Sequence, residues 1–172
     1  DLFFSTQKEI LIQRIELGKV ILSFDDARIT KKEITKKFHQ IGFEVINDPN
    51  VEIVEKIKIA AIELIFKSFN TNSLIRNSDY ISEKLQISYD KISRIFSQVT
   101  GVKLEKYIIL LKLEKAKEML LTNEFNISEI AFMMGYSSVQ YFSNQFKKNV
   151  GVTISKYKEN PAAFRKSLAA LV

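Results

Sequence analysis

The side chains that could recognise a nucleic acid lie in two short segments of the last hundred residues. Gln140 and Asn144 are four residues apart, so in a helix they project from the same face. An asparagine or glutamine side chain can form two hydrogen bonds with adenine, and an arginine such as Arg94 can form two with guanine. These residue types therefore point to the reading of base edges in a DNA groove.

The composition argues against catalytic and metal chemistry. The 172 residues include no cysteine and one histidine, His39, which excludes thiolate metal sites, histidine clusters and Ser-His-Asp triads. The sequence contains no glycine-rich phosphate loop and no zinc-protease motif. His39 lies beside the apolar face of a predicted helix, and we interpret it as a surface or edge residue. We therefore expect no enzyme activity, no catalytic residue, no metal and no cofactor.

The positive charge of the chain is concentrated in its last hundred residues. Residues 1–72 hold 11 basic and 11 acidic side chains, whereas residues 73–172 hold 15 basic and 9 acidic ones, which accounts for the net charge of +6. Such an excess is typical of a surface that binds nucleic acid. The longest apolar runs, such as 107–111, are far shorter than the ~20 residues of a membrane span. From these short runs we expect no membrane partner. No signal peptide is visible, although the chain starts at Asp1, and the lack of cysteine fits a reducing compartment, so we expect a cytoplasmic protein.

An internal repeat indicates how the two recognition segments are built. Upstream positions pair at an offset of 49, with Ile81 matching Ile130 and Ser88 matching Ser137. Each copy has the layout of a helix-turn-helix unit, in which two helices are joined by a tight turn. At an offset of 50, the residues Ser93, Phe96, Gly101, Val102, Lys106 and Tyr107 match Ser143, Phe146, Gly151, Val152, Lys156 and Tyr157.

Capping residues and glycines set the expected helix ends. In the first copy, Ser78 is predicted to cap a helix over 79–85, and Ser88 a second helix over 89–100 that Gly101 ends. In the second copy, the expected elements follow the same order. There, Asn126 with Glu129 caps a helix over 127–134, Gly135 ends it, Ser137 or Ser138 caps the next helix, and Gly151 ends that one.

A long helix is expected to connect the two copies. One side of it is apolar and the other is charged, as in a helix that packs on one face. The apolar residues are Leu104, Tyr107, Ile108, Leu111, Ala116 and Leu120, and the charged ones are Lys112, Glu114, Lys115, Lys117 and Glu118. Tyr107 and Tyr157 occupy equivalent positions of the repeat, so both are predicted to anchor the core, as are Met133 and Met134.

Two stretches resemble a known family of regulators. Residues 126–160, NISEIAFMMGYSSVQYFSNQFKKNVGVTISKYKEN, resemble the signature of AraC/XylS-type transcription regulators. Residues 82–120, SEKLQISYDKISRIFSQVTGVKLEKYIILLKLEKAKEML, resemble that family's first helix-turn-helix and linker helix. The resemblance implies a mainly α fold with two recognition helices that enter successive major-groove segments of double-stranded DNA. It also implies RNA polymerase as a partner.

The candidate DNA-binding residues are those that face outward on the two recognition helices. Arg94 is the best candidate for a base contact, whereas Asp90 is interpreted as a capping residue. On the first helix the outward residues are Tyr89, Asp90, Lys91, Ser93 and Arg94, and Ile92, Ile95, Phe96 and Val99 face inward. On the second helix the outward residues are Ser138, Val139, Gln140, Ser143, Asn144, Lys147 and Lys148, and Phe142, Phe146 and Val150 face inward.

The outward residues of the second helix divide by role. Lys147 and Lys148 are expected to contact phosphates, together with Lys103, Lys106, Lys156 and Lys158. Val139 either touches a thymine methyl group or packs inside the protein. The family often has arginine where Asn144 stands, which changes the expected strength and base preference of the second contact.

Residues 1–70 are predicted to form a small α+β sensing or interaction domain. Two strands within 10–22 are broken at Gly18, and a capping box of Thr30 and Glu33 starts a helix. The helix should bury Ile34, Phe38 and Ile41 and end at Gly42; a strand over 43–46 and a helix over about 50–69, opened by Asp48-Pro49, follow. This order resembles a fragment of a ferredoxin-like, heavy-metal-associated domain without its Cys-x-x-Cys loop.

The expected domain order leaves two hypotheses for function open. Residues 71–77 are predicted as a linker, 78–160 as the tandem helix-turn-helix domain and 161–172 as a C-terminal tail helix. The first hypothesis is a sequence-specific DNA-binding regulator, with a homodimer formed through residues 1–70. The alternative is a protein-interaction or anti-activator module with weak or lost DNA binding. A repair methyltransferase with such a module would need acceptor cysteines, and the chain has none.

Overall fold

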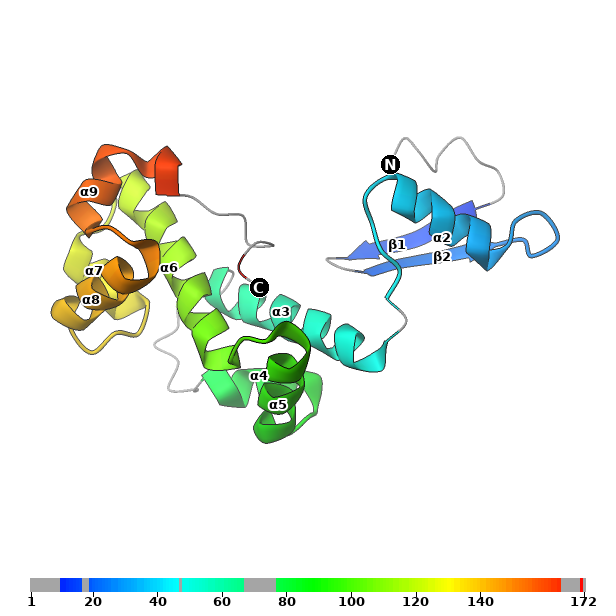
Figure 1. The fold of residues 1–172 in the computed structure, drawn as a ribbon, viewed down its shortest axis with the longest axis horizontal. Coiled ribbons are helices and arrows are strands. Elements are labelled where there is room, and N and C mark those ends of the chain that lie inside the picture. Colours follow the sequence, from blue (N-terminus) through cyan, green and yellow to red (C-terminus); the bar gives the residue numbers. More distant parts are fainter. Residues whose placement is uncertain (1–9, 17–18, 47, 67–76, 165–170, 172) are drawn as a thin grey trace. The chain divides into compact units, whose positions relative to one another are not determined.

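The computed structural model describes residues 10–16, 19–46, 48–66, 77–164 and 171. The chain divides into two compact units, Asp1–Glu55 and Lys56–Val172. Among the described residues, the first unit contains two strands, one helix and the start of a second helix, and the second unit is built from helices (Figure 1). The predicted fold class, a mainly α chain with a tandem helix-turn-helix preceded by a small α+β part, is confirmed.

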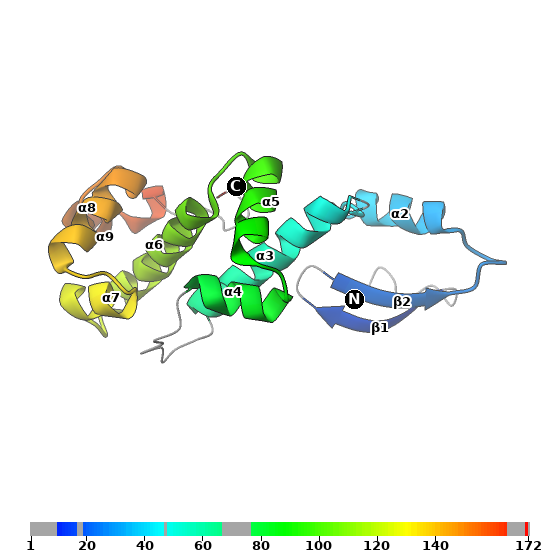
Figure 2. The same cartoon turned by 90° about the horizontal axis from the view of Figure 1, so that it is seen from below.

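A hairpin and one helix form the described core of the first unit. β1 (Ile10–Glu16) pairs antiparallel with β2 (Lys19–Phe24), so the predicted pair of strands is confirmed, and Gly18 itself lies outside the described residues. α2 (Lys31–Gln40) lies against one face of this hairpin, as the two views in Figures 1 and 2 show. The capping box is confirmed as well, because Thr30 and Glu33 exchange hydrogen bonds at the start of α2.

The segment after α2 differs from the prediction in two respects. Gly42 has a φ of +85°, and the Phe43 N–H donates to the Phe38 carbonyl at 3.0 Å, so the chain turns back over the end of the helix. Because of this turn, 43–46 lie outside any described strand, and the predicted strand is wrong. The predicted burial of Ile41 is also wrong, since this residue stands at the helix C-cap and is 37% exposed. The resemblance to a ferredoxin-like domain loses the strand on which it partly depended.

α3 (Pro49–Phe66) crosses the boundary between the two units. Asp48 accepts a hydrogen bond from the Asn50 N–H at 2.7 Å, and Pro49 occupies the first helical position, where its missing N–H costs nothing. The last three residues of the predicted helix, 67–69, lie outside the described residues. From Lys56 onward the helix belongs to the second unit, and its buried residues there are Ile57, Ala60, Ala61 and Leu64.

The second unit continues with two helix-turn-helix pairs joined by a long helix. The first pair is α4 with α5, the second is α7 with α8, and α6 connects them. The bounds are α4 (Asn77–Leu85), α5 (Tyr89–Thr100), α6 (Leu104–Thr122), α7 (Ile127–Met133), α8 (Val139–Val150), α9 (Ile154–Glu159) and a 3-10 helix, η1 (Pro161–Phe164).

Most of the predicted helix ends of the second unit are confirmed. The side chain of Asn126 accepts hydrogen bonds from the N–H groups of Ser128 and Glu129 at 2.9 and 3.0 Å, which completes a capping box. Ser138, rather than Ser137, caps α8. The predicted cap at Ser78 is wrong, because α4 already begins at Asn77. Ser88 stands at the N-cap of α5, but its side chain forms no capping hydrogen bond.

The connecting helix α6 is buried on more sides than the sequence predicted. All six residues of its predicted apolar stripe are buried, and so are Leu113 and Met119. Lys117, predicted to be on the charged outer face, is only 3% exposed. Its ammonium donates to the Phe164 carbonyl at 2.8 Å and lies 2.6 Å from the Glu114 carboxylate. Lys117 is therefore a buried, paired residue that holds the C-terminal segment against α6, and the prediction of its exposure is wrong.

The predicted linker and the predicted tail helix lie in segments that the structure describes only in part. The linker proposed at 71–77 lies outside the described residues except for Asn77, and α3 joins the second unit upstream of it. Of the proposed tail helix, residues 161–164 form η1 and 165–170 are outside the described part. No helix in the described part combines the length and apolar character needed to cross a membrane.

Candidate nucleic-acid interface

The first candidate recognition helix, α5, has one buried and one exposed face. Ile92, Ile95 and Phe96 are at most 6% exposed, as predicted for the inward side. Asp90, Lys91 and Arg94 are exposed on the opposite side, and Ser93 is half-buried. Val99 was predicted to face inward but is 40% exposed, because it lies in the last turn of the helix, beyond the packed centre. The exposed side of α5 thus combines a guanidinium, an ammonium and a carboxylate.

Tyr89 connects the start of α5 to the connecting helix. Its hydroxyl donates to the Glu105 carboxylate on α6 at 3.0 Å. Burial, followed by the hydrogen bond and the negative charge of Glu105, raises the pKa of Tyr89 to about 12. The phenol therefore remains a neutral donor at physiological pH, and it fixes the first turn of α5 to the first turn of α6. This partner was not predicted, since 16 residues separate the two positions.

The second candidate recognition helix, α8, repeats this arrangement. Phe142 and Phe146 are fully buried, and Val150 is half-buried, as predicted. The outward residues are exposed except for Ser143, which is half-buried: Ser138, Val139, Gln140, Asn144, Lys147 and Lys148. The Ser138 hydroxyl is used locally, because it accepts the Tyr141 N–H at 3.1 Å at the start of the helix.

The two amide side chains on α8 are paired with each other. The Gln140 Nε2 donates to the Asn144 Oδ1 at 3.2 Å, so the side chains lie together on one exposed face. The pair leaves the Gln140 Oε1 as an acceptor and the Asn144 Nδ2 as a donor. An acceptor beside a donor matches the major-groove edge of adenine, which offers one donor and one acceptor. The predicted shared face is thus present, in the form of a coupled pair.

Lysine and asparagine contacts join α8 to the connecting helix. The Lys106 ammonium, one residue after Glu105 on α6, hydrogen-bonds to the Asn149 Oδ1 near the end of α8. The first turn of α6 therefore contacts both candidate recognition helices, Tyr89 of α5 through Glu105 and Asn149 of α8 through Lys106. We call Tyr89, Glu105, Lys106 and Asn149 the α6 clamp.

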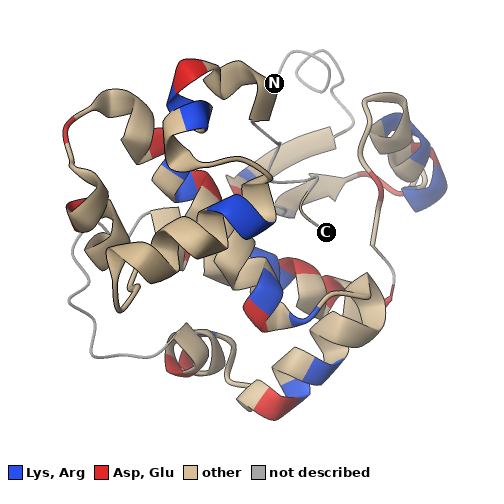
Figure 3. Cartoon of the chain, turned by 60° about the vertical axis from the view of Figure 1, so that its left-hand side comes forward, with Lys and Arg blue, Asp and Glu red and all other residues tan. Residues whose placement is uncertain are grey.

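Acidic residues lie among the basic ones over the helices (Figure 3). The other predicted phosphate neighbours, Lys103, Lys156 and Lys158, are exposed, and the Lys158 ammonium donates to the Asn123 Oδ1 at 3.0 Å. Lys147 and Lys148 stand in the last turn of α8.

Within the described residues, no three potential metal-binding side chains of the His, Cys, Asp and Glu types come together.

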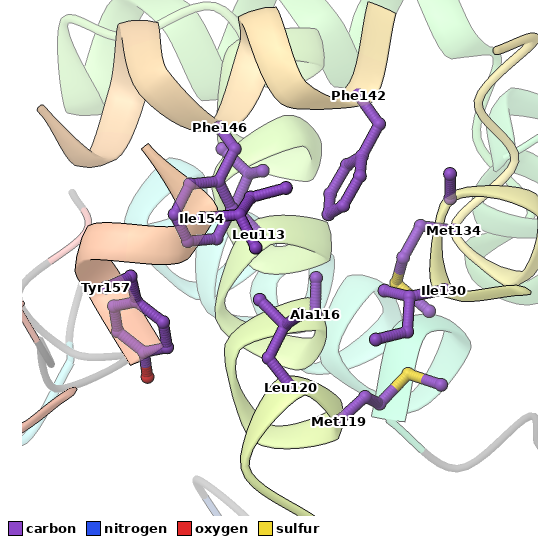
Figure 4. Packing of buried hydrophobic residues seen from close by; sticks show 11 residues of the cluster. Leu113, Ala116, Met119, Leu120, Ile130, Met134, Phe142, Phe146, Ile154 and Tyr157 are labelled. Carbon is purple, nitrogen blue, oxygen red and sulfur yellow. The ribbon is translucent and has the colours of Figure 1, made fainter. Parts of the chain in front are cut away.

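An apolar core beneath α8 sets the direction of its exposed face. Figure 4 shows Phe142 and Phe146 pointing from α8 toward Leu113 and Ala116 of α6, with Tyr157 of α9 beside them. The ring centroids of Phe146 and Tyr157 are 5.5 Å apart in an edge-on arrangement. Tyr157 and its repeat equivalent Tyr107 are both at most 1% exposed, so the predicted core role of the two tyrosines is confirmed.

Tyr136 in the turn before α8 extends this core, and the sequence offered no signal for it beyond its aromatic type. Its ring lies 5.2 Å from that of Phe142 and 5.8 Å from that of Tyr141. Burial raises the pKa of Tyr136 to about 12. Met134 is buried as predicted, whereas the predicted burial of Met133 is wrong, since it is 37% exposed on the outer side of α7 beside Phe132.

Known proteins share this architecture and sequence. The helix-turn-helix domain family matches residues 81–160. The probable transcription factor PqrA of Proteus vulgaris is 34% identical over 82 residues, which cover 48% of this chain and 67% of that protein. The chain belongs to the AraC-type regulators. An AraC-type DNA-binding regulator from Chromobacterium violaceum has the same fold, with a TM-score of 0.52 at 23% identity, over 62% of this chain and 92% of that one.

The chain matches only a part of one longer relative. The xylose operon regulatory protein of Escherichia coli K12 is 33% identical over 81 residues, which cover 47% of this chain and 21% of that protein. The chain therefore corresponds to about a fifth of the length of that relative. The shared part is the DNA-binding domain of transcription regulators, and it contains both candidate recognition helices, α5 and α8.

Proposed function

We propose that this chain regulates transcription by binding a specific double-stranded DNA sequence with α5 and α8. The observation that carries the proposal is the pair of helix-turn-helix units, each with a buried apolar side and an exposed side of base-reading residue types. Membership of the AraC-type family supports the same function. Each recognition helix would lie in one major-groove segment, and the α6 clamp would set the distance between them. Selection of bound DNA from a random library, followed by titration of the selected sequence, tests the proposal.

Base reading and phosphate contact are assigned to different side chains. Arg94→Ala should weaken binding to the selected site by about 1–3 kcal/mol and relax base choice at one position, because the variant cannot form a bidentate contact to guanine. Lys147→Ala should weaken binding to all sequences alike and reduce the salt slope by about one unit, because the variant cannot reach a phosphate. Fluorescence anisotropy titrations over a range of salt concentrations measure both. Equal losses by the two variants on specific and random DNA would contradict the assignment of Arg94.

The α6 clamp leads to a prediction about half-site spacing. We expect two half-sites about one helical turn, roughly 10 bp, apart, and a free-energy cost of binding when one base pair is inserted between them. Lys106→Met should reduce this cost, because the variant lacks the hydrogen bond to Asn149 and holds α8 less firmly. Lys103→Met is the matched control, since Lys103 is an exposed lysine directly before α6. Full-affinity binding to an isolated half-site would contradict the geometry altogether.

The first unit is proposed to sense an effector or to mediate self-association. Leu11 and Ile15 of β1 are 66% and 58% exposed, and Val20 of β2 is 39% exposed. Exposed apolar residues of this kind favour an interface. Two copies related by a twofold axis would cover the exposed apolar residues of both hairpins at once. RNA polymerase is the proposed partner in transcription. Light scattering of the full chain and of variants such as Ile15→Ser measures the self-association.

A protein-interaction or anti-activator module is the second candidate function. Phe132 is 72% exposed on α7, with Ile127 and Met133 each 37% exposed on the same helix. These apolar residues favour a protein partner for α7, and Asn144 stands where the family often has arginine. The library selection distinguishes the two functions, since an anti-activator would enrich no DNA sequence.

A further inference from the structure

We propose that the basic face of α2 in the first unit binds the DNA backbone beside the sequence that α5 and α8 recognise. The inference rests on the proposed function, because it requires that the second unit hold the DNA. α2 contains four lysines and one acidic residue in ten positions, although the first 72 residues together are electrically neutral. In Figure 3 the helix correspondingly carries several blue segments and little red.

Three of the four lysines of α2 are exposed to solvent, and the fourth, Lys37, is half-buried. Ile34 is 6% exposed and packs against the hairpin, whereas Lys31, Lys32 and Lys36 are exposed. Lys32 and Lys36 are four residues apart, so their side chains lie next to each other along the helix. Their two ammonium groups can therefore meet neighbouring phosphates on one strand.

The acidic groups near this face are engaged elsewhere. Glu33, the acidic residue of α2, accepts hydrogen bonds from the N–H and the hydroxyl of Thr30, both at 2.8 Å, in the capping box. Asp25 accepts the Ala27 N–H at 3.0 Å and pairs with Arg28 at 3.4 Å. Among the described residues, no carboxylate lies within ion-pair distance of Lys31, Lys32 or Lys36. These three ammonium groups are available to an external anion.

An open hollow next to the lysines suits a phosphate group. It has a volume of about 250 Å³ and is lined by Arg28, Ile29, Glu33, Lys36, Lys37 and Gln40. Three of these six side chains are cationic and one, Glu33, is a carboxylate that the capping box engages, and the hollow is open to solvent. An open, cationic hollow fits one group of an extended polyanion better than a small molecule, which needs enclosure on most sides.

The composition of the face favours nucleic acid over an acidic protein. The centre of a protein interface is usually apolar and poor in lysine, whereas the exposed side of α2 is formed by lysine, glutamine and histidine together with Glu33 of the capping box. Lysine is a common contact to phosphate in protein–DNA complexes. The covalent connection through α3 also keeps this weak site at high local concentration once the second unit has bound.

Salt-dependent titration of the full chain with two DNA probes tests the inference. The short probe contains only the selected recognition sequence, and the long probe adds about two helical turns, roughly 20 bp, on each side. The double variant Lys32→Gln/Lys36→Gln should have a salt slope about two units smaller than the wild type on the long probe and an unchanged slope on the short probe. Arg14→Gln is the control, because it removes one positive charge from the hairpin and should leave the salt slope on both probes unchanged. It is compared with the single variant Lys36→Gln, which removes one positive charge from α2.

The possible outcomes distinguish a failure of the inference from a failure of the proposed function. If the wild type binds the long probe specifically with the same salt slope as the double variant, this result would overturn the inference alone. It would favour an acidic protein as the partner of the α2 face. Failure of the wild type to bind either probe specifically would overturn the proposed function and the inference together. Circular dichroism of the double variant should match the wild type, since both substitutions are at exposed helix positions.

Discussion

A chain shortened to begin at Asn72 should unfold about 10 °C or more below one that begins at Asp48, because the shorter chain lacks α3. Ile57 and Leu64 of this helix are 0% and 8% exposed, and burial of two such side chains contributes about 3–6 kcal/mol. The aromatic ring of Phe66 lies 5.4 Å from the Lys115 ammonium of α6, which ties the end of α3 to the connecting helix. Without α3, the surface of the second unit that this helix covers would be exposed to water.

Thermal unfolding followed by circular dichroism measures the difference between the two shortened chains. In the full chain, Ile57→Ala should cost about 2–5 kcal/mol, because a fully buried side chain is removed. Asn50→Ala, at an exposed position of the same helix, should change stability by less than about 0.5 kcal/mol. Equal melting temperatures for the two shortened chains would favour the boundary predicted at 71–77 over the division after Glu55.

The same pair of chains tests whether the first unit influences DNA binding. A chain from Asp48 keeps α3 and lacks the hairpin and α2, so any change in its affinity reports the part of the first unit before Asp48. A chain from Asn72 would confuse that effect with the removal of α3. The ion pair between Glu63 of α3 and Lys84 of α4, for example, can form in the chain from Asp48 and cannot form in the chain from Asn72.

Features that depend on a few neighbouring residues were predictable from the sequence. The capping boxes at Thr30 and Asn126 need only a side chain and a glutamate three residues later, and both are present. The glycine at the end of α5, Gly101, has a φ of +73°, as a left-handed cap requires. The repeat placed the helices α5 and α8 correctly, because each apolar face recurs with the same spacing.

Features that depend on distant partners were missed. The burial of Lys117 depends on the Phe164 carbonyl, 47 residues away, and a periodicity argument places a lysine on the outside by default. The α6 clamp joins Tyr89 to Glu105 and Lys106 to Asn149 across 16 and 43 residues. The strand predicted at 43–46 has suitable residue types, but a strand also needs a neighbour with which to pair, and the turn at Gly42 directs the chain back onto α2 instead.

Gly135→Val should destabilise the second unit by about 1–3 kcal/mol and lower its melting temperature by roughly 4–10 °C. Gly135 has a φ of +73° in the turn between α7 and α8, a conformation that a branched side chain adopts only with strain. A Cβ atom there would also meet the half-buried Lys112 ammonium at 3.3 Å. DNA affinity should fall together with stability, because the turn at Gly135 sets the orientation of α8 relative to α7.

The first copy of the repeat provides the comparison for this glycine. Gln86 occupies the equivalent position in the turn between α4 and α5, with a φ of +54°. Both turns end their helix in the same way, with the Gly135 and Gln86 N–H groups donating to the carbonyls of Phe132 and Glu83. An unbranched side chain is therefore tolerated in this turn, and Gly135→Gln should cost less than Gly135→Val.

Gly101→Val separates backbone strain from the contact with Lys112. Gly101 has the same φ of +73°, but a Cβ atom there would meet nothing within 4 Å. Gly135→Val should therefore be the more destabilising of the two, and the additional substitution Lys112→Ala should recover part of the difference. Chemical denaturation of the variants measures these free energies, and DNA titration follows in parallel. If Gly135→Val left the melting temperature unchanged, the turn before α8 would not require a left-handed residue, and the equivalence of the two turns would fail.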